Sequence, residues 1–238
     1  MTQASKITTV AVSGPSSSGK TTVVKLINQL INQNTDCKSI IIHLDDYYFD
    51  DDKIPIDKET GELNWDCSEA INYCKFANDI KLIRDNQLID QKSIEPEIKI
   101  DLNQDSIDVL VKKLNKLPKN STIVFIDGFM LFHNEELLDL FDIKIFIYSE
   151  YSTLKSRREA RNGYTTAQGF WVDPPKYFDK IVWPEFIKNH QYLFDNQNLT
   201  NGLSTKCQQL NINGIKNENL SIFDLASLTI DNLIDGFD

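Results

Sequence analysis

Two kinds of hydrophobic pattern alternate along the chain. Short runs rich in β-branched residues predict strands, and apolar residues that recur every three or four positions predict helices. The expected strands lie at residues 7–12, 39–44, 122–127 and 143–148, with a further candidate at 208–213. The expected helices lie at residues 21–32, 68–86, 105–117, 153–161 and 221–234, with a short helical patch at 135–141. This alternation is typical of an α/β fold, in which helices cover a central parallel sheet.

Local signals refine this outline. Ser68 is expected to begin the second helix, and Pro118 is expected to stop the third. Residues 87–103 are polar and lack a clear period, which predicts a surface insertion. The segment that begins at Trp183, WPEFIKNHQYLF, predicts a packed amphipathic helix and not a second site. Because no internal repeat is visible, we expect one α/β domain over residues 1–238.

The composition narrows the classes of protein to which the chain can belong. It has 238 residues, a hydrophobic content of 41% and a formal net charge of -10. So acidic a chain lacks the basic surface that nucleic-acid phosphates require, and it has no basic amphipathic segment suited to a membrane surface. No stretch approaches the ~18 apolar residues of a membrane span, and the amino-terminal apolar run is too short for a signal peptide.

The cysteines and histidines show no spacing typical of a metal site, a disulfide framework or a catalytic triad. They are Cys37, Cys67, Cys74, Cys207, His43, His133 and His190. We expect the thiols to be reduced and mostly packed, and the histidines to be structural. Together with the lack of a targeting segment, this predicts a cytoplasmic protein.

One motif points directly to a nucleotide. GPSSSGKT, residues 14–21, matches the phosphate-binding pattern G-x-x-x-x-G-K-[ST] in full, between an expected strand and an expected helix. Gly14 and Gly19 allow a tight turn that points backbone N–H groups at a phosphate, and the helix adds its positive end. Lys20 is expected to neutralise β- and γ-phosphate oxygens, and the Thr21 hydroxyl to ligate Mg²⁺.

The pattern therefore predicts an ATP or GTP site. Its residues are Gly14, Pro15, Ser16, Ser17, Ser18, Gly19, Lys20, Thr21 and Thr22. The DxxG and NKxD segments of GTPases are missing, as is the LSGGQ-type signature of transporter ATPases. The chain is also too short for most helicase or AAA-type cores. A small-molecule kinase remains.

An acidic cluster, HLDDYYFDDD at residues 43–52, directly follows the second expected strand. Ligands of open α/β sheets bind beyond the carboxyl ends of strands, so Asp45 and Asp46 would lie beside the phosphate loop if the first two strands are neighbours. A kinase that acts on a hydroxyl needs a base there. We assign that role to Asp45, the first residue past the strand, with Asp46 in support. Asp50, Asp51 and Asp52 are expected to form a solvated loop.

Side chains elsewhere in the sequence suit the same pocket. The rings of Tyr47, Tyr48 and Trp65 are expected to stack a flat substrate base, and Asp66 to hold ribose hydroxyls. Asp127, in VFIDGF at residues 124–129, ends the third strand and is expected to face the metal through water; the alternative is an aspartate that opens a turn.

A basic cluster, SRREAR at residues 156–161, contrasts with the acidic remainder of the chain. Its arginines, Arg157, Arg158 and Arg161, fall within one and a half helical turns. Lid arginines of this kind clamp phosphates and stabilise the charge that develops during transfer. A solvated charged face is the alternative.

Taken in order, these motifs resemble those of nicotinamide riboside kinases, P-loop enzymes related to uridine and nucleoside monophosphate kinases. The resemblance is carried by GPSSSGKTT, HLDDYYF, NWDCSEA, IDGFMLF, KSRREAR and FWVDPPKYFDKIVWP, from about residue 7 to residue 194, and it is strongest to the fungal members. FWVDPPKYFD is the most specific segment. The resemblance implies a P-loop NTPase fold of the nucleoside monophosphate kinase type, with a substrate-side insertion over about 45–103 and a lid over about 153–175.

The resemblance also implies an activity, with ATP and Mg²⁺ as cofactors. It is transfer of the ATP γ-phosphoryl to the 5′-hydroxyl of nicotinamide riboside, and of nicotinic acid riboside, in NAD salvage. A pocket of carboxylates and aromatic faces suits a ring that carries a positive charge. The implied partners are the pyridine riboside and ATP, with no nucleic acid and no membrane, and the protein is expected to be a monomer or a weak homodimer.

Roles follow residue by residue. The implied catalytic residues are Asp45, Lys20 and Arg157, and the implied metal neighbours are Thr21, Asp45 and Asp127. The riboside is expected to contact Asp45, Asp46, Tyr47, Tyr48, Trp65, Asp66, Arg158 and Asp173. Tyr164, Phe170 and Trp171 are alternatives for capping the base, and we favour Trp171. The nucleotide is expected to contact Arg157, Arg161 and, by a looser match at NGIKNE, Lys216, Asn217 and Glu218.

Two other functions stay open. A uridine or cytidine kinase shares the phosphate loop and the aspartate after the second strand, although NWD and FWVDPP favour the pyridine riboside. A nucleotide-binding regulator would keep the fold and lack catalysis. It would bind ATP without forming ADP with any riboside.

Overall fold

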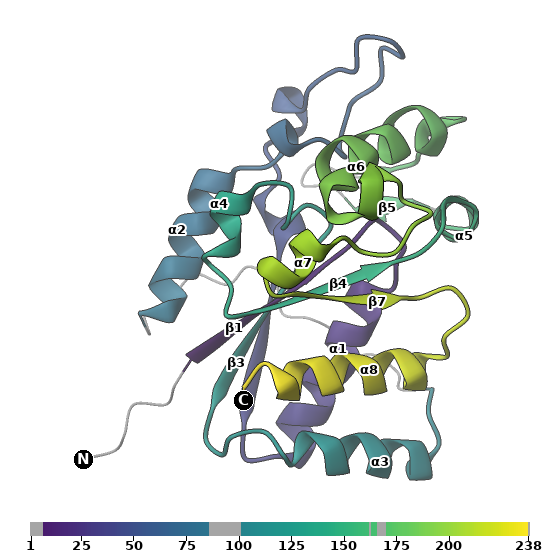
Figure 1. Ribbon diagram of the computed structural model, residues 1–238. Helices are drawn as coiled ribbons and strands as arrows, with labels where there is room; N and C mark the ends of the chain where they lie inside the picture. Colours follow the sequence, from purple (N-terminus) through teal and green to yellow (C-terminus); the bar gives the residue numbers. More distant parts are fainter. Residues whose placement is uncertain (1–6, 86–100, 162, 166–169, 238) are drawn as a thin grey trace.

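The computed structural model describes residues 7–85, 101–161, 163–165 and 170–237. Its centre is a five-stranded sheet in which all neighbouring strands run parallel (Figure 1). In chain order the strands are β1 (Ile7–Ser13), β2 (Lys38–His43), β3 (Thr122–Gly128), β4 (Ile143–Tyr148) and β7 (Ile212–Lys216). Across the sheet the order is β2-β3-β1-β4-β7. The strand β3 therefore separates β1 from β2, so the condition that the first two strands are neighbours is not met.

Helices cover both faces of this sheet. Successive side chains of a strand point to opposite faces, so Val10 and Val12 of β1 join one core cluster and Ala11 joins the other. The first cluster packs under α1 (Lys20–Asn34), α3 (Gln104–Leu114) and α8 (Ile222–Asp235). The second packs under α2 (Tyr73–Arg84), α4 (Glu135–Leu138), α6 (Trp183–His190) and α7 (Thr205–Gln209).

A third cluster lies beyond the carboxyl ends of the strands. It joins the residues that follow β2 to α5 (Tyr151–Glu159) and to the π-helical turn Phe178–Val182. The Tyr177 hydroxyl donates to the Leu63 carbonyl at 2.8 Å and accepts from the Trp65 N–H at 3.0 Å, which fastens the two parts together. A two-stranded antiparallel hairpin, β5 (Tyr164–Thr165) and β6 (Phe170–Trp171), follows α5.

Most expected elements are confirmed within a few residues, and two are not. The helix expected from Ser68 begins at Tyr73, because the Asn72 side chain caps it by accepting from the Lys75 N–H at 3.0 Å. The expected strand at 208–213 is displaced: α7 covers 205–209, and the strand β7 starts at Ile212.

Other expectations concern the surface. The amphipathic helix expected from Trp183 is α6, continued by a 3₁₀ turn over Gln191–Leu193. The expected insertion at 87–103 lies mostly outside the described residues. No helix in the described part of the chain is long and apolar enough to cross a membrane.

Candidate active site

The phosphate loop links β1 to α1 by a route that only glycine can follow at two positions. Gly14 has a φ of 150°, and a Cβ atom there would lie 1.9 Å from the Ile147 carbonyl oxygen of β4. Gly19, with a φ of 96°, is left-handed and directly precedes α1. Both conformations are costly for residues that carry a side chain. The loop is therefore built for close backbone approach.

The loop presents a row of unused backbone donors. Of its inner N–H groups, that of Ser18 donates to the Pro15 carbonyl at 3.2 Å. No acceptor within the described ranges takes the N–H groups of Ser16, Ser17, Gly19, Lys20, Thr21 and Thr22. Free N–H groups at a helix amino-terminus form a ready-made anion site. The loop thus has the donors that a polyphosphate needs.

Lys20 supplies the charge. Its side chain is buried, and its Nζ lies 3.4 Å from the Pro15 carbonyl oxygen, folded over the loop. Burial lowers the pKa of Lys20, although the nearby charges of Asp127 and Asp45 oppose this shift. An ammonium group held between a phosphate loop and two carboxylates is placed to bind a phosphate oxygen.

Asp127, in β3, is oriented by a neighbour that the sequence did not single out. The register of β2 and β3 places His43 opposite Asp127, and His43 Nδ1 lies 3.0 Å from Asp127 Oδ2. Burial by itself raises the pKa of Asp127, but the His43 hydrogen bond, the Lys20 charge and the nearby Thr21 hydroxyl together lower it. The Asp127 Oδ1 atom is buried without a hydrogen-bond partner among the described residues.

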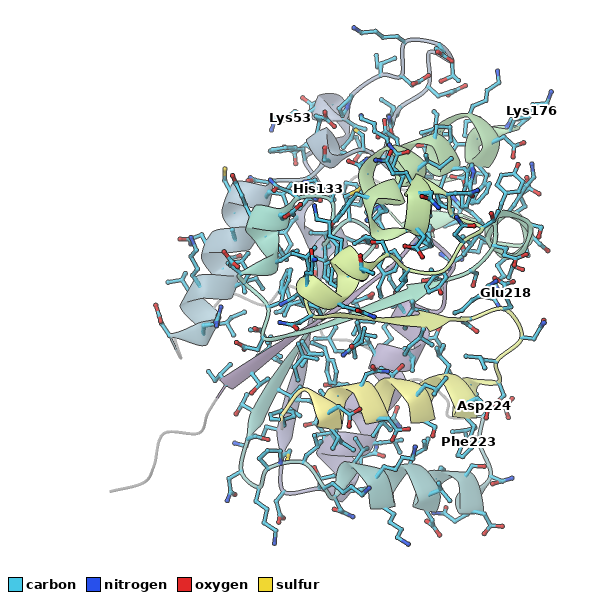
Figure 2. The ribbon with its side chains drawn as sticks, in the orientation of Figure 1. Lys53, His133, Lys176, Glu218, Phe223 and Asp224 are labelled. Atoms are coloured by element: carbon cyan, nitrogen blue, oxygen red, sulfur yellow. The ribbon has the colours of Figure 1, made fainter. Side chains whose placement is uncertain are left out.

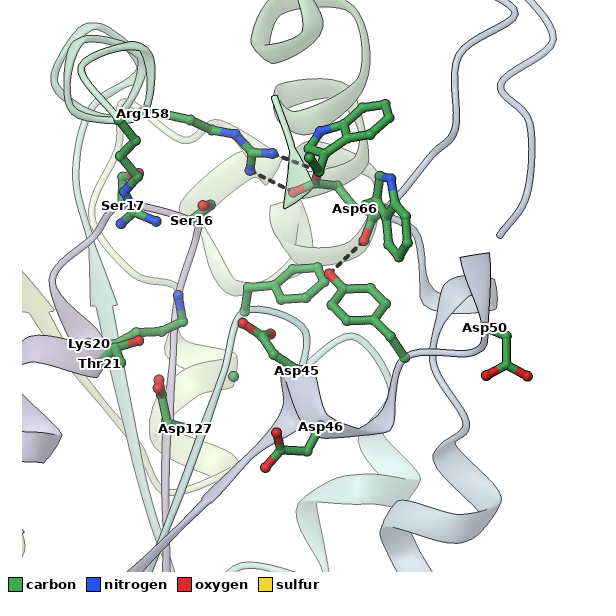
Figure 3. Close-up of a pocket in the computed structure, with 16 residues that line it drawn as sticks. Ser16, Ser17, Lys20, Thr21, Asp45, Asp46, Asp50, Asp66, Asp127 and Arg158 are labelled. Carbon is green, nitrogen blue, oxygen red and sulfur yellow. Dashed lines mark hydrogen bonds and ion pairs between the residues drawn. The ribbon is translucent and has the colours of Figure 1, made fainter. Parts of the chain in front are cut away.

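Asp45 lies beyond the end of β2, in a 3₁₀ turn over Leu44–Tyr47. Asp45 is itself exposed to solvent, but the protein around its carboxylate partly desolvates it, which raises its pKa, and the charge of Asp127 adds to the rise. Asp45, Lys20 and Thr21 line a common cavity of about 700 Å³, a size that suits a small ligand (Figure 3).

The far side of this cavity is aromatic. Tyr48, Trp65 and Trp171 line it as expected, and so does Phe129, which sequence reasoning missed. The Tyr48 and Phe129 rings stack with their centroids 6.2 Å apart, and the ring centroids of Trp65 and Trp171 are 6.0 Å apart. Phe170, one of the two competing residues for the capping role, is 64% exposed and does not line the cavity, and the side chain of the other, Tyr164, lies outside those described. Of Phe170 and Trp171, the structure favours Trp171.

Arg158 holds the aromatic side of the cavity in place through ion pairs with two aspartates. Its guanidinium binds Asp66 with two hydrogen bonds of 3.0 and 3.2 Å, and its Nε donates to Asp173 at 2.6 Å. Asp173 also accepts from the Trp171 indole N–H at 2.9 Å. The bidentate Asp66–Arg158 pair is buried and appears in Figure 3. Arg158 thus links α5, the residues after β2 and the capping tryptophan.

Several expected site residues lie outside the cavity. Tyr47 is buried in the second core cluster, where its ring meets Phe76 edge-on and its hydroxyl donates to Asp79 at 3.1 Å. Its expected role in stacking the base is therefore wrong in this arrangement, because the 3₁₀ turn points its ring into the core.

Asp46 and Arg161 line the cavity, whereas Arg157 does not. Arg157 instead donates to the Glu218 carbonyl at 3.3 Å.

The end of β7 and the loop that follows it also lie outside the cavity. Lys216 pairs with Glu150 at 2.8 Å, and the Glu218 carboxylate accepts from the Thr153 hydroxyl at 2.7 Å. Figure 2 shows Glu218 at the edge of the molecule, on the connection between β7 and α8. Asn217 is buried against the phosphate loop.

Comparisons with known proteins agree with this geometry. The Phosphoribulokinase / Uridine kinase family profile matches residues 9–162. The nicotinamide riboside kinase of Schizosaccharomyces pombe is 37% identical over 212 residues, which cover 84% of this chain and 86% of that protein. The chain belongs to the nicotinamide riboside kinase family.

Two further relatives define its position in that family. The nicotinamide riboside kinase of Saccharomyces cerevisiae is 37% identical over 198 residues, which cover 80% of each chain. The uridine kinase of Chlamydia pneumoniae is 26% identical over 164 residues, which cover 69% of this chain and 67% of that protein. The two fungal nicotinamide riboside kinases are thus more similar to this chain, over more of its length, than this uridine kinase.

Proposed function

We propose that the protein transfers the γ-phosphoryl group of ATP to the 5′-hydroxyl of nicotinamide riboside, giving ADP and nicotinamide mononucleotide, a step toward NAD. The two fungal relatives of that name support the choice of substrate. The observation that carries the proposal is the cavity itself. It joins Lys20 of the phosphate loop to the aromatic wall around Trp65 and Trp171, with Asp45 in its lining.

Each part of the reaction has a residue. The bond from the γ-phosphorus to its bridging oxygen breaks as a bond to the 5′-oxygen forms, and the 5′-hydroxyl proton passes to Asp45. Asp45 lines the cavity beside Lys20, and its pKa, raised by desolvation and by the charge of Asp127, suits a group that must accept a proton. Lys20 and Arg161, which line the cavity, stabilise the negative charge on the phosphate oxygens; Arg157 lies outside this lining, and its part in nucleotide binding stays a proposal from the sequence.

The residues present also fit Mg²⁺. The ion prefers oxygen ligands and takes one or two carboxylates together with substrate phosphates. Asp127 Oδ1 is a buried carboxylate oxygen with no hydrogen-bond partner in the described ranges. Asp45 and the Thr21 hydroxyl line the same cavity. We assign Mg²⁺ to Thr21, Asp45 and Asp127, which would hold the ion where it would neutralise phosphate charge.

Other parts of this assignment stay proposals. They are the use of nicotinic acid riboside, a single kinase domain with an insertion over about 45–103, a lid over about 153–175, and a monomer or weak homodimer. The four cysteines are free thiols, three of them buried and Cys74 exposed, which suits a reducing compartment. A cytoplasmic location also stays a prediction.

The test is product identification. Purified protein with ATP, Mg²⁺ and nicotinamide riboside should form one new phosphate ester, which ³¹P NMR should show coupled to the 5′-methylene protons. Omitting the riboside should abolish the signal. A phosphate on another ribose hydroxyl, or no ester at all, would contradict the proposal.

A further inference from the structure

Asn217 stands out because it is buried, polar and in contact with the phosphate loop from behind. It directly follows β7 and is 4% exposed. Its side-chain Nδ2 donates to the Ser18 carbonyl oxygen at 2.7 Å. Neither Asn217 nor Leu225 of α8, which also abuts Gly19, lines the cavity. Asn217 therefore touches the loop on the side opposite the expected phosphates.

The backbone of Asn217 is held as firmly as its side chain. Its N–H donates to the Tyr148 carbonyl at 2.7 Å, and its own carbonyl accepts from the Ser149 hydroxyl at 2.5 Å. These bonds extend the pairing of β4 and β7 by one residue, since Tyr148 is the register partner of Lys216. An asparagine side chain is short, so a fixed backbone leaves Nδ2 little freedom.

The contact determines the orientation of one peptide plane. The described backbone contains no cis peptide bond, so the Ser18 carbonyl and the Gly19 N–H point in opposite directions. Because Asn217 holds the carbonyl behind the loop, the Gly19 N–H is turned toward its concave side. That N–H has no acceptor in the part of the chain that the structure describes.

The same contact also affects the first turn of α1. In a regular helix the Ser18 carbonyl would accept from the N–H of Thr22, four residues later. Here it accepts from Asn217, and the next carbonyl, of Gly19, accepts from Val23 at 3.1 Å. The Thr22 N–H belongs to the first turn of α1, where helix N–H groups lack an intrahelical acceptor, and it remains among the unused donors of the loop.

We infer that Asn217 is a positioning residue of the phosphate loop, which orients the Ser18–Gly19 peptide toward a bound polyphosphate and does not itself contact the base of the nucleotide. This refines the sequence expectation, which placed Asn217 in a nucleotide-contacting loop. The inference rests on the proposed function only in taking a triphosphate as the ligand.

The test separates the triphosphate from the base. The probes are ATP and inorganic tripolyphosphate, which share the phosphates and differ in the nucleoside. Dissociation constants are measured by calorimetry for the wild type, for Asn217→Ala and for the matched control Asn213→Ala, an exposed asparagine of β7, the strand that Asn217 follows. Should Asn217→Ala not fold, Asn217→Leu removes the donor while keeping most of the volume.

We expect Asn217→Ala to raise the dissociation constants of ATP and tripolyphosphate by the same factor, about ten- to hundredfold. A loss of this size is typical when a hydrogen bond to a charged group is misplaced. The Michaelis constant for ATP should rise by that factor while kcat at saturating ATP stays near the wild-type value. Asn213→Ala should leave both dissociation constants unchanged.

Two outcomes would overturn the inference. Weaker ATP binding with unchanged tripolyphosphate binding would mean that Asn217 contacts the base. A lower melting temperature with both dissociation constants unchanged would mean that its role is structural only. Because both probes are used without a riboside, failure here is distinct from failure to phosphorylate nicotinamide riboside.

Discussion

Among single residues, Asp45 is the one on which the proposed chemistry depends most directly. Asp45→Asn keeps the shape of the side chain and removes its capacity to take a proton. We expect turnover to fall by about 10²- to 10⁴-fold, as for loss of a general base, with nucleotide binding retained. Steady-state ADP release and an ATP titration measure the two quantities. Near-normal turnover in this variant would show that another group is the base.

His43 is the second residue that can be tested alone. It orients Asp127 through a hydrogen bond of 3.0 Å, in the way that outer residues orient metal ligands. His43→Phe removes that bond, whereas His43→Asn can keep a donor at a similar place. We expect His43→Phe to lower the affinity for Mg²⁺ by about 10- to 100-fold. The readout is the Mg²⁺ concentration that half-saturates binding of a non-hydrolysable ATP analogue. Equal affinities in the wild type and His43→Phe would remove His43 from the site.

The site residues that the sequence revealed are those whose role follows from local spacing. Lys20 and Thr21 belong to a contiguous motif, and Asp45 follows a recognisable strand. His43 was expected to be merely structural, because its contact with Asp127 depends on the register of two strands far apart in the chain. Tyr47 was misplaced for a related reason: the direction of its ring is decided by a 3₁₀ turn.

At the scale of elements, α5 is attached to the substrate side of the cavity through Arg158. Arg158→Met would leave Asp66 and Asp173 facing each other without a cation. Removing one partner from a buried ion network costs about 3–5 kcal/mol, and we expect a loss of unfolding free energy of about 3 kcal/mol. Chemical denaturation measures it.

The matched control is Arg157→Met, one position earlier on α5. Arg157 is only half-buried and donates to a backbone carbonyl. We expect its unfolding free energy to change by less than about 0.5 kcal/mol while the Michaelis constant for ATP rises. Equal stability losses in the two variants would contradict the role given to the Arg158 network.

The last residue of α6 predicts a pH dependence of stability. His190 is fully buried, stacked on Phe146 and Phe186, and burial lowers its pKa to about 3 from an ordinary value of 6.5. Below pH 6.5 the unfolded chain therefore binds a proton at His190 that the folded protein excludes. The contribution of His190 to the free energy of unfolding should therefore fall by about 1.4 kcal/mol per pH unit as the pH drops toward 3.

His190→Phe isolates this contribution from that of the carboxylates. The variant keeps a stacked ring without a titrating nitrogen, so its stability relative to the wild type should improve by about 2 kcal/mol between pH 7 and pH 5. Urea denaturation at the two pH values measures the difference. A difference that does not change with pH would mean that His190 is protonated within the fold.

Elements could be predicted from the sequence where a periodic pattern was strong. The four amino-terminal strands and the helices α1, α3, α5 and α8 were found within a few residues. The start of α2 was missed because Ser68 and Asn72 are both suitable caps, and packing of the residues between them decides the choice. The strand β7 is short and alternates weakly, so its position depends on pairing with β4.

At the scale of the whole molecule, the arrangement of the sheet explains how distant motifs form one site. The strand β3 lies between β1 and β2, so the carboxyl ends of the three strands bring Gly14, Asp127 and Asp45 to the same edge. The third core cluster then encloses this edge from the other side with residues from 54–70 and 154–182. The strand order could not be read from the chain, because the hydrophobic pattern of a buried strand does not identify its neighbours.

The most direct test is Mg²⁺-dependent ADP release from ATP, with nicotinamide riboside, nicotinic acid riboside, uridine and cytidine compared side by side. We predict strong release with the pyridine ribosides and little with uridine or cytidine. Release with uridine or cytidine instead would mean a pyrimidine nucleoside kinase and a wrong assignment of the aromatic pocket. ATP binding without ADP release on any of the four would contradict the kinase itself and favour a nucleotide-binding regulator.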